Sequence, residues 1–104
     1  DSRFVSGGEN IYPEAIESSL LELPGIEAAL VVPVQDEEFD RRPAAFVKTR
    51  GEWSPGGWRN ALAERLPRHM LPLRFLRWPA REGGLKLNRQ KAARLAQARL
   101  TEDE

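Results

Sequence analysis

The chain has 104 residues, no cysteine and one histidine, and sixteen basic residues balance sixteen acidic ones. This composition excludes disulfides, thiolate catalysis and metal sites built from cysteine or several histidines, and it gives no overall field for nucleic acid or an anionic membrane. The length suits one globular domain, no apolar run approaches the roughly 20 residues of a membrane span, and we expect a cytoplasmic protein.

The N-terminal stretch predicts a short strand, a glycine turn and then a helix. Phe4 and Val5 are β-forming residues, and Pro13 suits the first turn of a helix because its missing N–H is not needed there. Gly7 and Gly8 permit positive φ and let another molecule approach the backbone closely. The residues leave two interpretations open: a turn that serves the fold, or a place where the backbone meets a ligand.

Apolar spacing and breaker residues predict the remaining elements. In chain order we expect a helix over 13–23, a central strand over 26–34, a charged loop over 35–42, an antiparallel strand over 43–49, a helix over 54–66 capped by the Ser54 hydroxyl, a strand over 73–78 and a helix over 89–100.

These elements predict an α+β fold. It has a small central sheet of about three strands, mostly antiparallel, flanked by three helices and preceded by a short N-terminal strand or hairpin. Trp53, Trp58 and Trp78 are expected in the core or at its rim. The chain begins without methionine, and we therefore expect a domain cut from a longer protein.

A second unusual stretch, from Gly83 to Lys91, places a lysine after two glycines and just before the last helix. Lys86 is followed by Arg89 and Lys91 in the first helical turn, where positive charge opposes the helix dipole. An anion bound there would resolve the conflict, because the helix N–H groups and the cations would share it. The simpler alternative is a solvated basic helix start.

The two stretches together resemble the C-terminal domain of the adenylate-forming superfamily, which comprises acyl- and aryl-CoA ligases, luciferases and the adenylation domains of peptide synthetases. Residues 6–17 resemble SGGENIxPxEIE, with Ala15 in place of a glutamate. Residues 66–72 resemble LPxYMxP, with His69 at the aromatic position. Residues 84–89 resemble TGKxxR, with the glycine displaced by one.

Two segments are similar to one branch of the superfamily, the o-succinylbenzoate–CoA ligases of menaquinone biosynthesis. Residues 83–90 resemble GGxKxxRQ, and residues 38–43 resemble EFGxRP. The resemblance implies that residues 1–104 form the mobile C-terminal domain of an AMP-forming ligase, cut at the hinge from a large N-terminal domain. It also implies that a carboxylate and ATP form an acyl-adenylate and pyrophosphate, and that the thiol of CoA then displaces AMP.

The resemblance assigns a separate part of the domain to each step. Lys86 is implied to contact the substrate carboxylate and the α-phosphate during adenylation. The loop of Ser6, Gly7, Gly8 and Glu9 is implied to line the tunnel for the pantetheine arm of CoA. An exposed strand-end lysine and a plain turn are the corresponding structural alternatives.

Three further residues are assigned by their positions in the motifs. Asp1 matches the hinge between the domains. His69 is a candidate contact for the CoA nucleotide, with a partly exposed structural histidine as the alternative. Arg89 is a supporting residue that either pairs with an acid of the large domain or closes the turn.

The resemblance thus implies ATP with Mg²⁺ and CoA as substrates, the chain's own large domain as partner, and no resident metal. We expect the chain alone to be inactive and to bind no cofactor stably. Three alternatives stay open: another aryl- or fatty-acyl-CoA ligase, a peptide-synthetase adenylation domain, and a non-catalytic interaction module that uses the basic residues of segment 59–99.

Overall fold

The computed structural model describes residues 2–80 and 87–102. In chain order the elements are β1 (Phe4–Ser6), β2 (Glu9–Ile11), α1 (Pro13–Leu21), β3 (Ile26–Asp36), β4 (Asp40–Thr49), α2 (Pro55–Ala63), a 3₁₀ turn (Arg68–Met70), β5 (Arg74–Arg77) and α3 (Arg89–Glu102). The predicted α+β fold, with an N-terminal hairpin, a three-stranded sheet and three helices, is confirmed.

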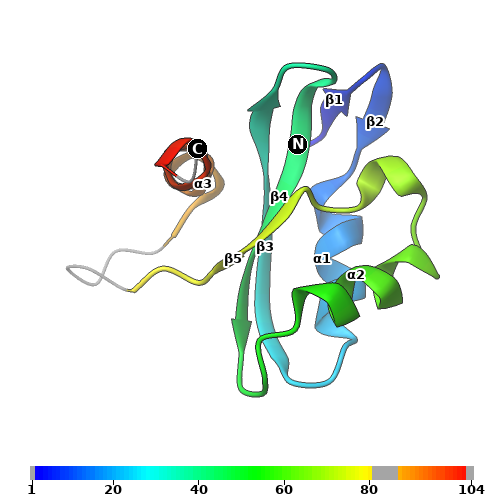
Figure 1. Cartoon of the computed structure of the whole chain (residues 1–104), viewed down its shortest axis with the longest axis vertical. Coiled ribbons are helices and arrows are strands. Elements are labelled where there is room, and N and C mark those ends of the chain that lie inside the picture. The colour runs from blue at the N-terminus through cyan, green and yellow to red at the C-terminus, as the bar shows by residue number, and fades with distance from the viewer. Residues whose placement is uncertain (1, 81–86, 103–104) are drawn as a thin grey trace.

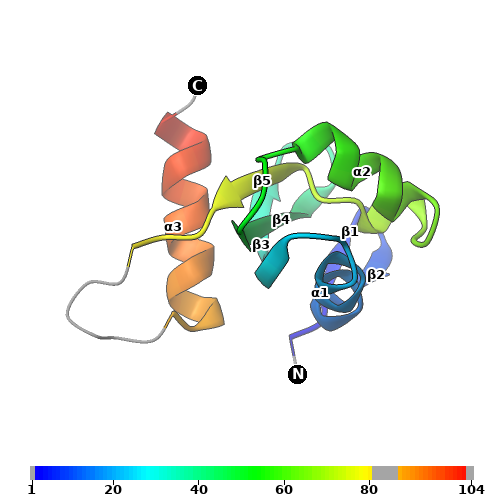
Figure 2. The same cartoon turned by 90° about the horizontal axis from the view of Figure 1, so that it is seen from below.

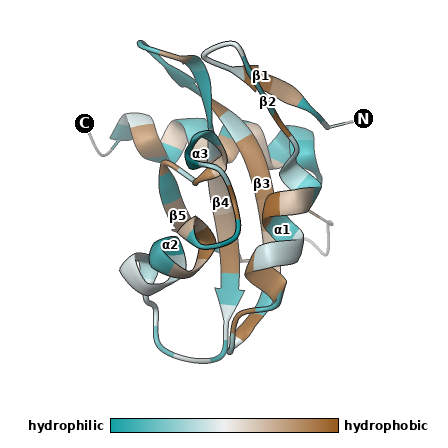
Figure 3. Ribbon diagram, turned by 90° about the vertical axis from the view of Figure 1, so that its right-hand side faces the viewer, coloured by the Kyte–Doolittle hydropathy of each residue, from teal (hydrophilic) through white to brown (hydrophobic). Residues whose placement is uncertain are grey.

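The main sheet has the strand order β3-β4-β5, and the hairpin β1-β2 is separate from it. β3 and β4 are antiparallel, whereas β4 and β5 are parallel. The expectation that β3 is the central strand is wrong, because β5 pairs with the other side of β4 and leaves β3 at an edge. β3 is nevertheless apolar on both faces, since helices cover both faces of the sheet (Figure 3).

The sheet lies between two layers (Figures 1 and 2). One face packs against the hairpin, α1 and α2, and the other packs against α3. Alternation along each strand divides the core, so that Val31 and Val47 face the first layer whereas Val32 and Phe46 face α3. Ala92 and Ala96 are fully buried, and their small side chains bring α3 close to the sheet.

The charged loop predicted over residues 35–42 is shorter than expected. β3 extends to Asp36 and β4 begins at Asp40, so that three residues connect the strands. The Asp36 carboxylate accepts hydrogen bonds from the backbone N–H groups of Glu38 and Phe39, at 3.1 and 2.9 Å, which fixes this tight connection. The predicted Ser54 cap makes no side-chain hydrogen bond to the helix.

The three tryptophans lie in the core or at its rim, as predicted. Trp58 is buried and makes edge-to-face contacts with Trp53 and Phe75, with ring centroids 4.9 and 5.5 Å apart. Trp78 packs against the α3 side of the core. The rings of Trp53, Trp58 and Phe75 thus belong to the core on the α2 side of the sheet, and Trp78 belongs to the core on the α3 side.

Candidate functional site

The glycine pair forms the turn of the β1-β2 hairpin. Ser6 pairs with Glu9, which leaves a two-residue turn in which Gly7 has φ 55° and Gly8 has φ 84°. A two-residue hairpin turn with positive φ at both positions matches the right-handed twist of the strands, and glycine adopts it without a steric penalty. The fold itself therefore accounts for the backbone angles of both residues.

The two glycines differ in their surroundings. The backbone N–H of Gly7 donates to the carbonyl oxygen of Phe39 at 2.8 Å, and a Cβ added to Gly7 would lie 2.6 Å from Cδ1 of the Phe39 ring. A Cβ added to Gly8 would meet nothing within 4 Å. Gly7 thus packs against the β3-β4 connection, whereas Gly8 presents open backbone at the surface.

This difference predicts that Gly7→Ala destabilises the chain more than Gly8→Ala. Positive φ alone costs an alanine about 1–2 kcal/mol, and Gly7→Ala adds a clash with the Phe39 ring. Denaturant unfolding of both variants measures the difference. In a Phe39→Ala background the extra cost at Gly7 should disappear, and persistence of the full cost would contradict the packing explanation.

The hairpin, the β3-β4 connection and the 3₁₀ turn enclose an open pocket of about 670 Å³, the hairpin pocket. It is lined by Ser6, Gly7, Glu9, Glu38, Phe39, Arg42, Arg68 and His69. The structure therefore brings together four of the residues singled out from the sequence, although they come from segments about 60 residues apart. Gly8 does not line the pocket.

Charged and aromatic groups surround the hairpin pocket. The guanidinium of Arg42 lies 5.8 Å from the ring centroid of Phe39, and Phe39 is 40% exposed. His69 Nε2 lies 4.0 Å from Glu9 Oε2. Two arginines, an imidazole and an exposed aromatic ring suit a ligand that carries phosphates and a flat ring, and the carboxylates of Glu9 and Glu38 lie beside them.

Sequence reasoning did not single out Phe39, Arg42 or Arg68, which also line the hairpin pocket. Phe39 and Arg42 lie within the segment that resembles EFGxRP, and this motif was the available signal. Nothing in the local pattern places that segment against the glycine turn, because the contact depends on how the hairpin folds onto the sheet.

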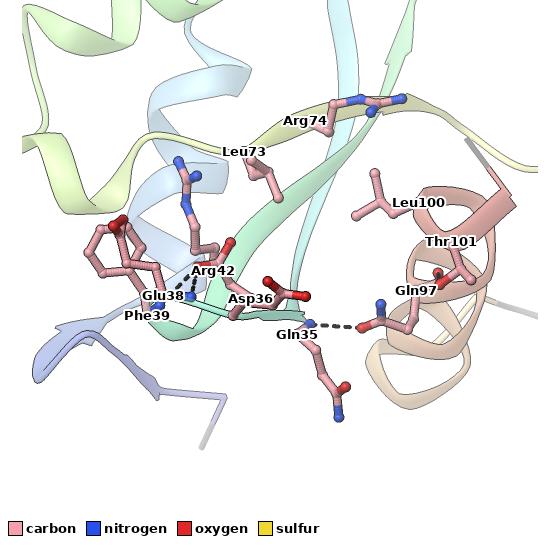
Figure 4. Close-up of a pocket in the computed structure, with 11 residues that line it drawn as sticks. Gln35, Asp36, Glu38, Phe39, Arg42, Leu73, Arg74, Gln97, Leu100 and Thr101 are labelled. Atoms are coloured by element: carbon pink, nitrogen blue, oxygen red, sulfur yellow. Dashed lines mark hydrogen bonds between the residues drawn. The ribbon is translucent and has the colours of Figure 1, made fainter. Parts of the chain in front are cut away.

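A second pocket of about 520 Å³ lies between the end of the β3-β4 hairpin, β5 and the C-terminal half of α3 (Figure 4). It shares Glu38, Phe39 and Arg42 with the hairpin pocket. Gln97 of α3 accepts a hydrogen bond from the backbone N–H of Gln35 at 2.7 Å, which ties the helix to the end of β3. No motif or spacing in the sequence predicts this pocket.

The first turn of α3 finds both its helix cap and an acidic partner for its arginine within the domain. The Asn88 side chain accepts a hydrogen bond from the N–H of Lys91 at 2.8 Å and so caps the helix. Arg89 forms a two-pronged ion pair with Glu17, at 2.6 and 2.9 Å, and lies 3.5 Å from Glu14. The bond to Glu17, chiefly, raises the pKa of Arg89.

Arg89 therefore has an acidic partner in its own domain, which neither sequence interpretation had named. Glu14 takes part in the same charged group, where a hydrogen bond from Ser2, chiefly, and the nearby Arg89 lower its pKa. The unfavourable placement of a cation at a helix start is offset by these carboxylates. An external anion is not needed to explain Arg89.

No family model matches the chain. The 2-succinylbenzoate–CoA ligase of Salmonella typhimurium is 36% identical over 92 residues, which cover 86% of this chain and 20% of that protein. Superposition gives a TM-score of 0.81 and 33% identity, over 94% of this chain and 21% of the other, with E. coli MenE bound to an analogue of OSB-AMS. For a Mycobacterium tuberculosis fatty acyl CoA synthetase the TM-score is 0.82 at 29% identity, over 94% of this chain and 20% of that one.

The chain belongs to the adenylate-forming superfamily. It spans about a fifth of the length of the curated relatives it matches. Within the superfamily it is similar to the 2-succinylbenzoate–CoA ligases, in agreement with the resemblance seen in its motifs.

Two residues that the superfamily resemblance assigns, Lys86 and Asp1, lie outside the described residues, as do Gly83 and Gly84. Their roles therefore rest on the motifs. The structure describes residues before and after the segment 81–86. Trp78 donates its backbone N–H to the carbonyl oxygen of Val47 at 3.1 Å, and Leu87 packs against the α3 side of the core.

Within residues 2–80 and 87–102 of this adenylate-forming domain, no three metal-binding side chains form a cluster. In the same residues no helix has both the length and the hydropathy to cross a bilayer. Among the pockets of the described residues, the hairpin pocket contains Ser6, Gly7, Glu9 and His69 of the motifs.

Proposed function

We propose that this chain is the C-terminal domain of an AMP-forming acid–CoA ligase whose acid is 2-succinylbenzoate. The observation that carries the proposal is the 36% identity to a 2-succinylbenzoate–CoA ligase over 86% of the chain. The hairpin pocket supports it, because Ser6, Gly7, Glu9 and His69, which the motifs single out for CoA, lie together there.

In the first step the acid attacks the α-phosphate of ATP, and pyrophosphate leaves as the acyl-adenylate forms. Lys86 is the proposed catalytic residue. A cation that contacts both the carboxylate and the α-phosphate aligns the reactants, and it stabilises the charge that develops on the phosphate oxygens. Lysine suits this role as a compact charge on a long side chain.

In the second step the thiol of CoA attacks the acyl carbon and AMP leaves. We place the pantetheine arm along the open backbone at Gly8, where a side chain would obstruct it. The CoA nucleotide then lies in the hairpin pocket, with Arg42 and Arg68 available to its phosphates and His69 to its base.

The remaining components belong to the longer protein. A large N-terminal domain is the proposed partner, with Asp1 at the hinge that turns this domain between the steps. ATP is proposed to bring its Mg²⁺ to that large domain, since the described residues offer no cluster of metal ligands. The chain alone is then inactive and binds neither substrate stably, and the whole protein is cytoplasmic.

A chimera tests whether this chain acts as the C-terminal domain of such a ligase. This chain replaces the matching fifth of the Salmonella ligase, and the truncated ligase without any replacement is the control. The chimera should release pyrophosphate from ATP with 2-succinylbenzoate and form the thioester when CoA is added, whereas the control should do neither. A folded, monodisperse chimera that remains as inactive as the control would contradict the proposal.

A fatty-acyl-CoA ligase is the second candidate, because the Mycobacterium tuberculosis synthetase superposes equally well. The acid is selected by the large domain in this proposal, so the two candidates differ only in that domain. Pyrophosphate release by the chain joined to its own large domain, with 2-succinylbenzoate and fatty acids compared and CoA added separately, decides between them.

A further inference from the structure

Glu17 and Arg89 come from opposite layers and meet at the free edge of the sheet. Glu17 lies on α1 and Arg89 is the first residue of α3, 72 positions later. Two of their hydrogen bonds run to β3: Val31 donates its N–H to Glu17 Oε2 at 2.8 Å, and Arg89 Nη1 donates to the Val31 carbonyl oxygen at 3.0 Å. We call Glu17, Arg89 and the Val31 backbone the clasp.

Glu17 is the more buried member of the clasp, and Arg89 is partly exposed. The side chain of Glu17 is 13% exposed and that of Arg89 is 34% exposed. A bidentate arginine–carboxylate pair fixes both distance and orientation, and partial burial strengthens it. Removal of either partner leaves the other as a partly buried charge, so the two groups depend on each other.

The clasp determines where α3 begins relative to the sheet. Leu87, two residues before Arg89, packs against the α3 side of the core. Lys86 precedes Arg89 by three positions, and a chain of that length spans at most roughly 11 Å. Arg89 is therefore the residue of α3 that is nearest to Lys86 along the chain.

We propose that the clasp is a positioning device for adenylation: by holding the first turn of α3 against the β3 edge, Glu17 and Arg89 keep Lys86 within reach of the reacting groups. This inference rests on the proposed function. Neither Glu17 nor Arg89 touches the substrates in this account. Both act through the backbone that connects Arg89 to Lys86.

The two half-reactions separate positioning from general stabilisation. Loss of the clasp should impair the step that uses Lys86 and leave the step assigned to the hairpin pocket, which none of the clasp residues line. A purely stabilising ion pair would lower both rates together as the folded fraction falls. If Arg89 instead contacted a substrate directly, Arg89→Ala would slow adenylation whereas Glu17→Ala would not.

The experiment measures both half-reactions in the chimera with Glu17→Ala, Arg89→Ala and the double variant. Each single variant should slow adenylation by about 100-fold, as expected for a misplaced catalytic group, and the double variant should be no slower than either. Thioester formation from supplied acyl-adenylate should stay near the unmodified rate. Arg89→Lys should restore adenylation only in part, because lysine keeps the charge but cannot form the two-pronged contact.

Arg65→Ala is the matched control. It removes an ion pair with Glu22 of similar length, 2.8 Å, which is more exposed and distant from α3 in the sequence. Adenylation should remain unchanged in it. Equal loss of both half-reactions, additive effects of the two substitutions, or normal adenylation in Glu17→Ala would overturn the positioning role. An unmodified chimera that forms no acyl-adenylate would instead reject the proposed function, and the inference with it.

Discussion

Lys86→Ala in the chimera should slow acyl-adenylate formation by roughly 100- to 1,000-fold, the typical cost of removing one group that stabilises a charged transition state. Thioester formation from supplied acyl-adenylate should continue near the unmodified rate, because the lysine is assigned only to the first step. Single-turnover measurements of pyrophosphate release and of thioester formation give the two rates separately.

Lys91→Ala provides the control for this result. Lys91 is an exposed base five positions after Lys86 whose backbone N–H is capped by Asn88. Removing its charge should leave both half-reactions intact. If Lys86→Ala and Lys91→Ala behaved alike, the effect would come from the basic character of the helix start, and the assignment of Lys86 as the catalytic residue would be wrong.

Gly8→Leu should have the opposite effect, with adenylation preserved and thioester formation reduced roughly 100-fold. The structure gives the reason: a side chain at Gly8 meets nothing within the domain and projects into the open space assigned to the pantetheine arm. The same pair of single-turnover measurements checks this prediction, with CoA concentration varied to detect weaker binding.

Backbone strain at Gly8 has to be separated from obstruction. Gly25 has φ 83°, close to the 84° of Gly8, and a Cβ there would make only ordinary contacts. Gly8→Ala and Gly25→Ala should therefore cost similar stability, about 1–2 kcal/mol, while thioester formation survives in both. If Gly8→Ala, with its small side chain, abolished thioester formation as fully as Gly8→Leu, strain in the hairpin would explain the loss. The assignment of Gly8 to the pantetheine tunnel would then be wrong.

Local pattern was enough to predict most elements of the fold. The start of α3, the turn at Gly7 and Gly8 and the burial of Trp58 follow from residue type and spacing within a few positions. The neighbour order in the sheet did not follow, since burial on both faces gives β3 the apolar sequence of a central strand. The length of the β3-β4 loop was misjudged because the Asp36 carboxylate closes it tightly.

The site was predictable only in part, because some of its contacts join residues that are far apart in the chain. Motif spacing singled out the glycine turn and His69, and the fold brings them into one pocket. The contact of Phe39 with Gly7 and the pairing of Arg89 with Glu17 join residues far apart in the chain, so neither has a local signal. Such contacts depend on the packed layers, which periodicity does not describe.

In the proposed function one domain serves two chemical steps through two separate regions. The ratio of the adenylation rate to the thioester-formation rate, measured side by side in the Lys86→Ala and Gly8→Leu chimeras, tests this division of roles. The ratio should fall by about two orders of magnitude in the first variant and rise by about as much in the second. A ratio that moved in the same direction in both variants, or stayed at the unmodified value, would contradict it.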